Sequence, residues 1–182
     1  LFTLPGAPIV YYGDEIGMGD NIWLHDRNGV RTPMQWHDGP NAGFSDVPAD
    51  RLYAPVIDDE TYGFQQINVA AQEADEHSLL NTMRHMIGTR KQSPVFSRGS
   101  LEFLEPEDQA ILAYLRRHEN EVLLAVHNLV DEERAARLNL YEFVDRAPHD
   151  LLAASTLPII GPEPYVLTLP PFGYRWLKVA GS

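Results

Sequence analysis

Two neighbouring carboxylates, Asp14 and Glu15, follow an apolar run at Ile9–Tyr12. The run has the composition of a buried strand, and enzymes built on parallel strands place active-site groups at the C-terminal ends of those strands. A pair of carboxylates could act there as acid and nucleophile. Adjacent residues of an extended segment point to opposite sides, however, so the two are poorly placed to face one substrate. The pattern therefore favours a structural role, in which one or both anchor the loop through buried hydrogen bonds.

Arg31 is a better candidate for contact with a substrate. Its guanidinium carries five donors in a fixed plane and suits bidentate bonds to vicinal sugar hydroxyls or to a carboxylate. Pro33 and Trp36 would keep the surrounding segment rigid beside a sugar ring. Taken alone, an arginine in a loop more often forms a structural salt bridge, and this alternative stays open. Asp20 and Asn21, in the preceding loop, are weaker candidates for enclosing the same ligand.

Other catalytic and metal-binding motifs are absent from the sequence. None of the 7 histidines forms a His-Glu-x-x-His pair, and there is no Gly-x-Ser-x-Gly elbow, phosphate loop or dinucleotide fingerprint. The chain has 0 cysteines, which excludes disulfides, thiolate nucleophiles and thiolate-bound metals. We therefore assign no metal ligand and no cofactor to this chain.

The elements that position these residues change in character near Pro94. Before it, a strand at Ile9–Tyr12 leads into a long loop through about Glu60, followed by a helix. Ser78 is the expected helix cap, and Arg90 and Lys91 suit the negative C-terminal end. The apolar positions of one helical face are Leu79, Leu80, Met83, Met86 and Ile87.

After Pro94 the apolar residues recur in short runs separated by turn-rich or charged stretches. The expected strands are Leu101–Leu104, Ile111–Leu115, Val122–Val126, Leu138–Leu140, Tyr165–Leu169 and Tyr174–Val179. Short strands at this spacing predict an antiparallel β-sandwich. The domain prediction is accordingly an α/β part at residues 1–94 and an all-β part at 95–182.

Length and charge limit the function further. A chain of 182 residues is shorter than the ~250 of a complete (β/α)8 barrel. The net charge of −12 disfavours nucleic acid and anionic membranes as partners.

Pro and Gly interrupt the apolar start well short of a membrane span, so a cytoplasmic protein is the default expectation. The chain starts at Leu1, already within an apolar pattern, and we expect the C-terminal part of a larger polypeptide. The sequence leaves a homo-oligomer open.

Five segments occur in the order found in the α-glucosidase branch of the α-amylase superfamily, which the chain resembles. They are Tyr11–Met18, Arg31–Trp36, Asn41–Ser45, Ile67–Gln72 and Leu169–Trp176. The stretch Gly17–Val30 is similar to that of trehalose synthases, which interconvert maltose and trehalose. Each short motif is shared with oligo-1,6-glucosidases and sucrose isomerases, whereas Gly19-Asp-Asn-Ile-Trp23 favours trehalose synthases.

The resemblance implies that residues 1–94 supply the last strand, its long loop and the last helix of a (β/α)8 catalytic barrel, and that residues 95–182 form domain C. The family's catalytic carboxylates and its usual calcium ligands lie upstream. No catalytic or metal-binding residue is therefore expected here, and the isolated chain should be inactive. The resemblance also implies that Arg31 pairs with an upstream Asp and contacts the non-reducing glucose of maltose or trehalose.

Two other functions stay open at this point. The chain could be part of an α-glucosidase, an oligo-1,6-glucosidase or a sucrose isomerase. It could also be a non-catalytic carbohydrate-binding β-domain, which would need an exposed aromatic platform. Trp176 lies in an alternating terminal strand and is expected in the core, which argues against that platform.

Overall fold

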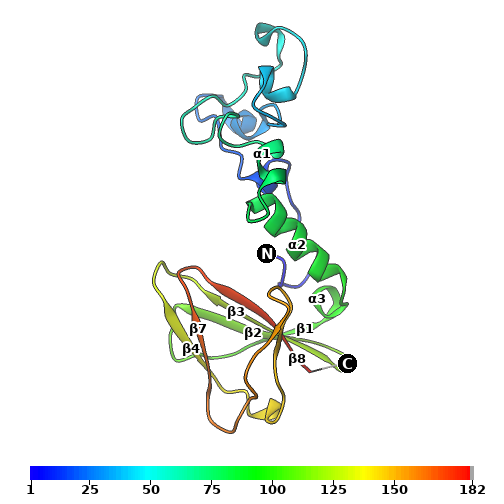
Figure 1. Cartoon of the computed structure of the whole chain (residues 1–182), viewed down its shortest axis with the longest axis vertical. Helices are drawn as coiled ribbons and strands as arrows, with labels where there is room; N and C mark the ends of the chain where they lie inside the picture. Colours follow the sequence, from blue (N-terminus) through cyan, green and yellow to red (C-terminus); the bar gives the residue numbers. More distant parts are fainter. Residues whose placement is uncertain (181–182) are drawn as a thin grey trace. The chain divides into compact units, whose positions relative to one another are not determined.

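A computed structural model describes residues 1–180 (Figure 1). The chain divides into two compact units, a loop unit made of Ile9–His85 and a β unit made of Leu1–Pro8 with the chain from Met86 onward. The domain boundary expected at Pro94 stays a prediction. The elements are η1 (Asp14–Ile16), η2 (Asp26–Arg31), η3 (Pro40–Gly43), η4 (Ala49–Arg51), α1 (Val69–Ala74), α2 (Leu79–Lys91), α3 (Val95–Arg98), β1 (Ser100–Phe103), β2 (Ile111–His118), β3 (Glu121–Asn128), β4 (Arg134–Leu138), η5 (Tyr141–Phe143), β5 (His149–Asp150), β6 (Ser155–Thr156), β7 (Tyr165–Leu169) and β8 (Tyr174–Ala180).

The strand expected at Ile9–Tyr12 does not form. No segment within residues 1–180 pairs with it, and the Ile9 side chain is 86% exposed. A strand is held by hydrogen bonds to a neighbouring strand, and the resemblance places those neighbours upstream. The prediction of a strand at Ile9–Tyr12 is wrong for this chain, because residues 1–180 offer the apolar run no partner strand.

Hydrogen exchange of the isolated chain should distinguish the unpaired segment Ile9–Tyr12 from the paired strands of the β unit. We expect amides of Ile9–Tyr12 to exchange with little protection, because the segment lacks ladder partners. Amides of Val122–Val126, in the middle of a sheet, should be strongly protected. Equal protection of the two segments in a monomer would contradict the expectation.

Helix α2 confirms the predicted start and end. The Asn81 amide donates to Ser78 Oγ at 3.2 Å, so Ser78 caps the helix as expected, and the helix ends at Lys91 before Ser93-Pro94. Its apolar face is only partly covered. Leu80 is 5% exposed and packs with Ile16 and Met34, whereas Leu79 is 44% exposed. This small cluster is the core of the loop unit.

The β unit is an antiparallel sandwich, as predicted. One sheet has the strand order β1-β2-β3-β8-β5-β6, and the second pairs β4 with β7 (Figure 1). Inward side chains of both sheets form one core, with Leu124, Leu138, Leu169 and Leu177 each at most 1% exposed. The sequence did not predict β5 and β6, whose two-residue strands are too short to produce a period. The strand expected at Leu138–Leu140 lies earlier in the chain, as β4, and shares only Leu138 with the prediction.

Strands β2 and β3 are buried on both faces. The second face of the larger sheet is covered by α3 and by the first residues of the chain. There the Phe96 and Trp176 rings lie 5.4 Å apart between centroids, and both are at most 2% exposed. Arg116 is also fully buried on this face, where its guanidinium donates to the carbonyls of Thr3, Gly99 and Ser100. Burial lowers the pKa of Arg116 from its usual value. The expectation that Trp176 is a core residue is confirmed.

Candidate functional site

The loop that carries the candidate residues begins with a tight turn at Gly13. The Asp14 carboxylate accepts from the Tyr11 amide at 2.9 Å, and the Glu15 carboxylate accepts from the Gly13 amide at 2.8 Å. Gly13 has φ +94°, and a Cβ there would lie 3.0 Å from Met18 Cβ, so only glycine fits. Both carboxylates therefore anchor the loop, as the sequence favoured. Asp14 is exposed instead of buried, because the turn lies at the surface of the unit.

The segment Arg31–Trp36 runs through the interior of the loop unit. Gln35 is fully buried, and its amide donates to the carbonyls of Tyr62 at 3.1 Å and Ile67 at 2.5 Å. The Gln35 carbonyl accepts from the Val69 amide at 3.0 Å, just where α1 begins. Gln35 thus joins three distant parts of the loop. Sequence reasoning missed this role because no local pattern signals a contact over about thirty residues.

Arg31 lies at the end of η2 and its backbone is held by two tyrosines. The Tyr53 hydroxyl donates to the Arg31 carbonyl at 2.5 Å, and the Tyr12 hydroxyl donates to the next carbonyl, that of Thr32, at 3.0 Å. Burial, with a smaller contribution from a hydrogen bond to Tyr53, raises the pKa of Tyr12 to about 12, so it stays a donor at neutral pH. Within residues 1–180 the guanidinium of Arg31 forms no ion pair, which leaves it available to other groups.

Asp20 and Asn21 pack against the turn that leads to Arg31. The Asn21 amide donates to the Gly29 carbonyl at 3.2 Å, and the Asn21 side chain accepts from the Trp23 amide at 3.2 Å. A Cβ at Gly29 would lie 1.9 Å from an Asp20 carboxylate oxygen, so glycine permits this close approach. No hydrogen bond or ion pair in the described chain joins the Arg31 side chain to Asp20 or Asn21. The structure brings these residues into one loop, but not into one hydrogen-bonded group.

Two cavities have Asp20 as a shared lining residue. A small one of about 120 Å³ lies beside Tyr11, Tyr12 and Val30. A larger one of about 590 Å³ lies between residues 20–23 and 56–62, and we call it the Trp23 groove. Its lining residues are Asp20, Asn21, Ile22, Trp23, Val56, Ile57, Asp58, Asp59, Glu60, Thr61 and Tyr62. The sequence analysis did not single out Trp23 as a site residue.

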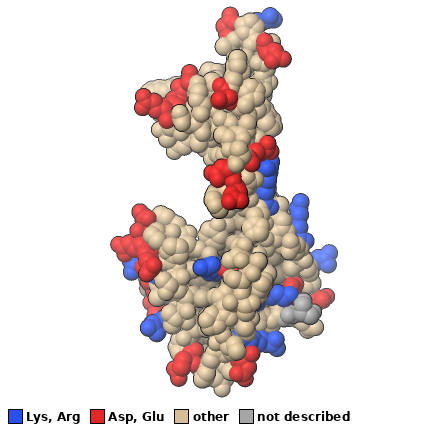
Figure 2. Space-filling model, viewed as in Figure 1, with Lys and Arg blue, Asp and Glu red and all other residues tan. Residues whose placement is uncertain are grey.

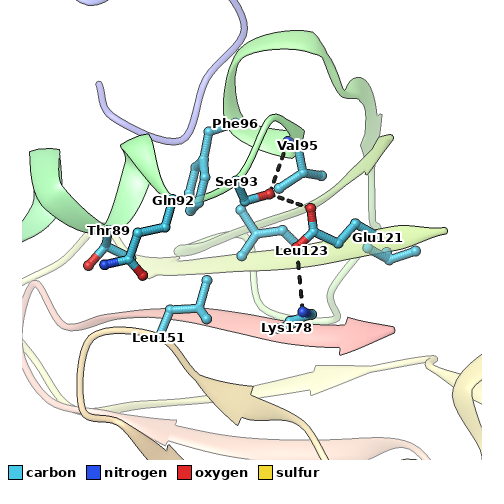
Figure 3. Close-up of a pocket in the computed structure, with 10 residues that line it drawn as sticks. Thr89, Gln92, Ser93, Val95, Phe96, Glu121, Leu123, Leu151 and Lys178 are labelled. Carbon is cyan, nitrogen blue, oxygen red and sulfur yellow. Dashed lines mark hydrogen bonds and ion pairs between the residues drawn. The ribbon is translucent and has the colours of Figure 1, made fainter. Parts of the chain in front are cut away.

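A further cavity of about 150 Å³ lies in the β unit, between the end of α2, α3 and strands β3 and β8 (Figure 3). Three of its polar side chains, those of Ser93, Glu121 and Lys178, are linked through Glu121. The Ser93 hydroxyl bonds the Glu121 carboxylate and accepts from the Val95 amide at 3.1 Å, and Lys178 Nζ lies 3.5 Å from Glu121 (Figure 3). This network ties α3 to the sheet and has a structural explanation.

Residues 1–180 contain no group of three or more His, Asp or Glu side chains arranged to hold a metal ion. The same part of the chain has no helix with the length and apolar character needed to cross a membrane.

Two family profiles match successive parts of the chain. The profile described as "Alpha amylase, catalytic domain" matches residues 1–99, and "Maltogenic Amylase, C-terminal domain" matches residues 101–176.

Among curated proteins, the chain is 43% identical over 182 residues to "Trehalose synthase/amylase TreS" of Mycobacterium tuberculosis, covering 98% of this chain and 30% of the relative. It is 45% identical over 175 residues to "Trehalose synthase" of Thermus thermophilus, covering 96% and 18% respectively. A "Probable oligo-1,6-glucosidase 3" of Bacillus subtilis is 31% identical over 162 residues, covering 70% and 28%. The chain thus spans about a third or less of these relatives.

Solved structures of the same fold include the trehalose-6-phosphate hydrolase TreA of Bacillus licheniformis. It superposes with a TM-score of 0.78 at 22% identity, covering 99% of this chain and 37% of that one. The trehalulose synthase MUTB superposes with a TM-score of 0.77 at 24% identity, covering 97% and 36%. At these identities the likeness establishes the fold: the end of a catalytic barrel followed by a β domain.

Proposed function

This chain belongs to the α-amylase family, and from that premise we propose that it is the C-terminal part of a retaining enzyme that interconverts maltose and trehalose. The observation that carries the proposal is the identity of 43–45% to trehalose synthases over nearly the whole chain. Its substrates are then maltose and trehalose, and its structural partner is the upstream part of the same barrel. The proposal also places the enzyme in the cytoplasm, which cell fractionation would test.

The proposed reaction is an intramolecular glucosyl transfer. An upstream carboxylate attacks the anomeric carbon while a neighbouring upstream carboxylic acid protonates the glycosidic oxygen of the departing glucose, giving a covalent glucosyl-enzyme. The released glucose stays enclosed, turns, and attacks the anomeric carbon through its own anomeric hydroxyl to form the 1,1 linkage. The acid, now a carboxylate, takes the hydroxyl proton, and the bond between the glucosyl group and the nucleophile breaks. Retention of that glucose and exclusion of water separate isomerisation from hydrolysis.

The residues of this chain would bind and enclose the sugar. Arg31 is proposed to donate to the non-reducing glucose and to an upstream Asp. Its unpaired guanidinium and its backbone, fixed by Tyr12 and Tyr53, support that role. Asp20 and Asn21 would close the neighbouring side through the turn at Gly29. No catalytic carboxylate is proposed here, since Asp14 and Glu15 are used to hold the turn.

Product analysis tests this function. The purified parent polypeptide should convert maltose to trehalose, and trehalose to maltose, with a smaller amount of free glucose. Residues 1–182 alone should show no turnover, because glycoside transfer needs two positioned carboxylates that the chain lacks. Sustained maltose conversion by the purified chain, free of contaminating enzyme, would contradict the proposal.

The second candidate is an oligo-1,6-glucosidase, favoured by the relative from Bacillus subtilis at 31% identity. Such an enzyme would release glucose by hydrolysis and form no trehalose. The same assay therefore separates the two candidates by their products.

A further inference from the structure

We propose that the Trp23 groove is a saccharide-binding site that takes a neutral sugar of glucose units on the face of the Trp23 ring. The choice of a glucose disaccharide as the ligand rests on the proposed function. The existence of the groove, its stacking surface and its polar wall are independent of that proposed function.

The apolar side of the groove is an exposed aromatic platform. Trp23 is 88% exposed and the adjacent Ile22 is 73% exposed. Large apolar side chains are seldom left open together unless they meet a ligand or another surface. The Trp23 backbone is nevertheless fixed, because its amide donates to the Asn21 side chain at 3.2 Å. A flat indole suits the C–H face of a pyranose ring.

The opposite side offers hydrogen-bond acceptors. It carries the carboxylates of Asp58, Asp59 and Glu60, and Asp20 lies beside the platform. One oxygen of Asp59 already accepts from the Thr61 and Tyr62 amides, at 2.8 and 2.6 Å, which orders this wall. No hydrogen bond or ion pair within residues 1–180 engages the carboxylates of Asp20 and Asp58. Each could therefore accept bonds from a pair of sugar hydroxyls.

The charge and size of the groove select the class of ligand. An anion would be repelled by four carboxylates, and acidic side chains are frequent on the visible face of the loop unit (Figure 2). The described residues do not gather these carboxylates into a metal site. A neutral polyhydroxy compound can stack on the Trp23 ring and donate hydrogen bonds to the carboxylates of the opposite wall. The volume of about 590 Å³ falls in the range of about 300–1,000 Å³ of small-ligand pockets and accommodates a disaccharide.

The two walls are held together before any ligand arrives. A Cβ at Gly19 would lie 2.6 Å from Tyr62 Cβ, so glycine lets the two segments approach closely. The Tyr62 carbonyl accepts from the buried Gln35 side chain at 3.1 Å. A groove with a fixed shape loses less conformational freedom on binding. Asp20 also lines the small cavity beside Tyr11 and Tyr12, so the two cavities share this residue.

The test uses the complete polypeptide with three variants: Trp23→Ala, Trp23→Phe and, as a control on another exposed aromatic, Tyr141→Ala. Binding of maltose is measured by calorimetric titration in the cold, where turnover is slow, alongside KM and product ratios. Loss of the platform should weaken maltose binding about tenfold. Trp23→Phe should restore most of the affinity, and Tyr141→Ala should leave it unchanged.

The outcomes separate this proposal from the proposed function. Unchanged maltose affinity in Trp23→Ala, with normal trehalose formation, would overturn the groove and leave the function standing. Weakened maltose binding by Trp23→Ala in a parent protein that forms no trehalose would support the groove and overturn the proposed function. A lower melting temperature with unchanged affinity would mean that upstream chain covers Trp23, and would also overturn the groove.

Discussion

Replacing Trp176 with alanine should destabilise the β unit by about 3–5 kcal/mol, the usual cost of removing a large buried aromatic side chain. Trp176 is 2% exposed and lies in β8, between β3 and β5. Its ring packs against Phe96 of α3 with centroids 5.4 Å apart. The indole Nε1 has no hydrogen-bond partner in the described residues, so the loss should come from packing and from the cavity left behind.

The chain described here already divides into two units, so one global unfolding transition would mix their stabilities. Hydrogen exchange of β3 amides reports the β unit directly and should show the loss. Trp176→Phe is the matched control, because it keeps a ring against Phe96 and should lower the stability of the β unit clearly less than Trp176→Ala. Weaker maltose binding with unchanged exchange rates would instead place Trp176 at a sugar-binding surface and make the core assignment wrong.

The sandwich was predictable because its strands carry their own signal. The run Tyr165–Leu169 alternates inward and outward residues, and β7 has the same bounds. Strands β2 and β3 are continuous apolar runs because both of their faces are buried. Arg116 interrupts that signal. A charged residue at a strand end reads as solvated, and only the fold brings the carbonyls of Thr3 and Gly99 to its guanidinium.

The loop unit was less predictable because its contacts are long-range. The apolar run Ile9–Tyr12 carries a strand pattern, yet no segment of residues 1–180 pairs with it. Motif resemblance pointed to Arg31, but the tyrosine that fixes its carbonyl, Tyr53, lies 22 residues away. Trp23 appeared only as part of a motif, since exposure of a side chain is a property of the folded loop.

Arg31→Lys in the complete enzyme should damage turnover far more than stability. Lysine keeps the charge but loses the planar fork that can hold a glucose hydroxyl and an upstream carboxylate together. Losing a charged hydrogen bond to the sugar costs about 1.5–3 kcal/mol, or roughly ten- to a hundredfold in kcat/KM. The defect should appear with maltose and with trehalose, because both must place a glucose in the same pocket. Hydrolysis should rise relative to isomerisation if water enters the loosened pocket.

Two variants separate contact with substrate from an effect on the loop. Arg27→Lys changes another exposed arginine of η2, which within residues 1–180 pairs only with the neighbouring Asp26 at 3.6 Å. This variant should leave the kinetics on both sugars unchanged. Tyr53→Phe removes the hydroxyl that holds the Arg31 carbonyl and should cause a smaller loss, because it acts on the backbone while the guanidinium remains. Unchanged kinetics of Arg31→Lys on both sugars would remove Arg31 from the site. The guanidinium would then serve as a structural ion pair with the upstream chain, which a fall in melting temperature without a kinetic defect would reveal.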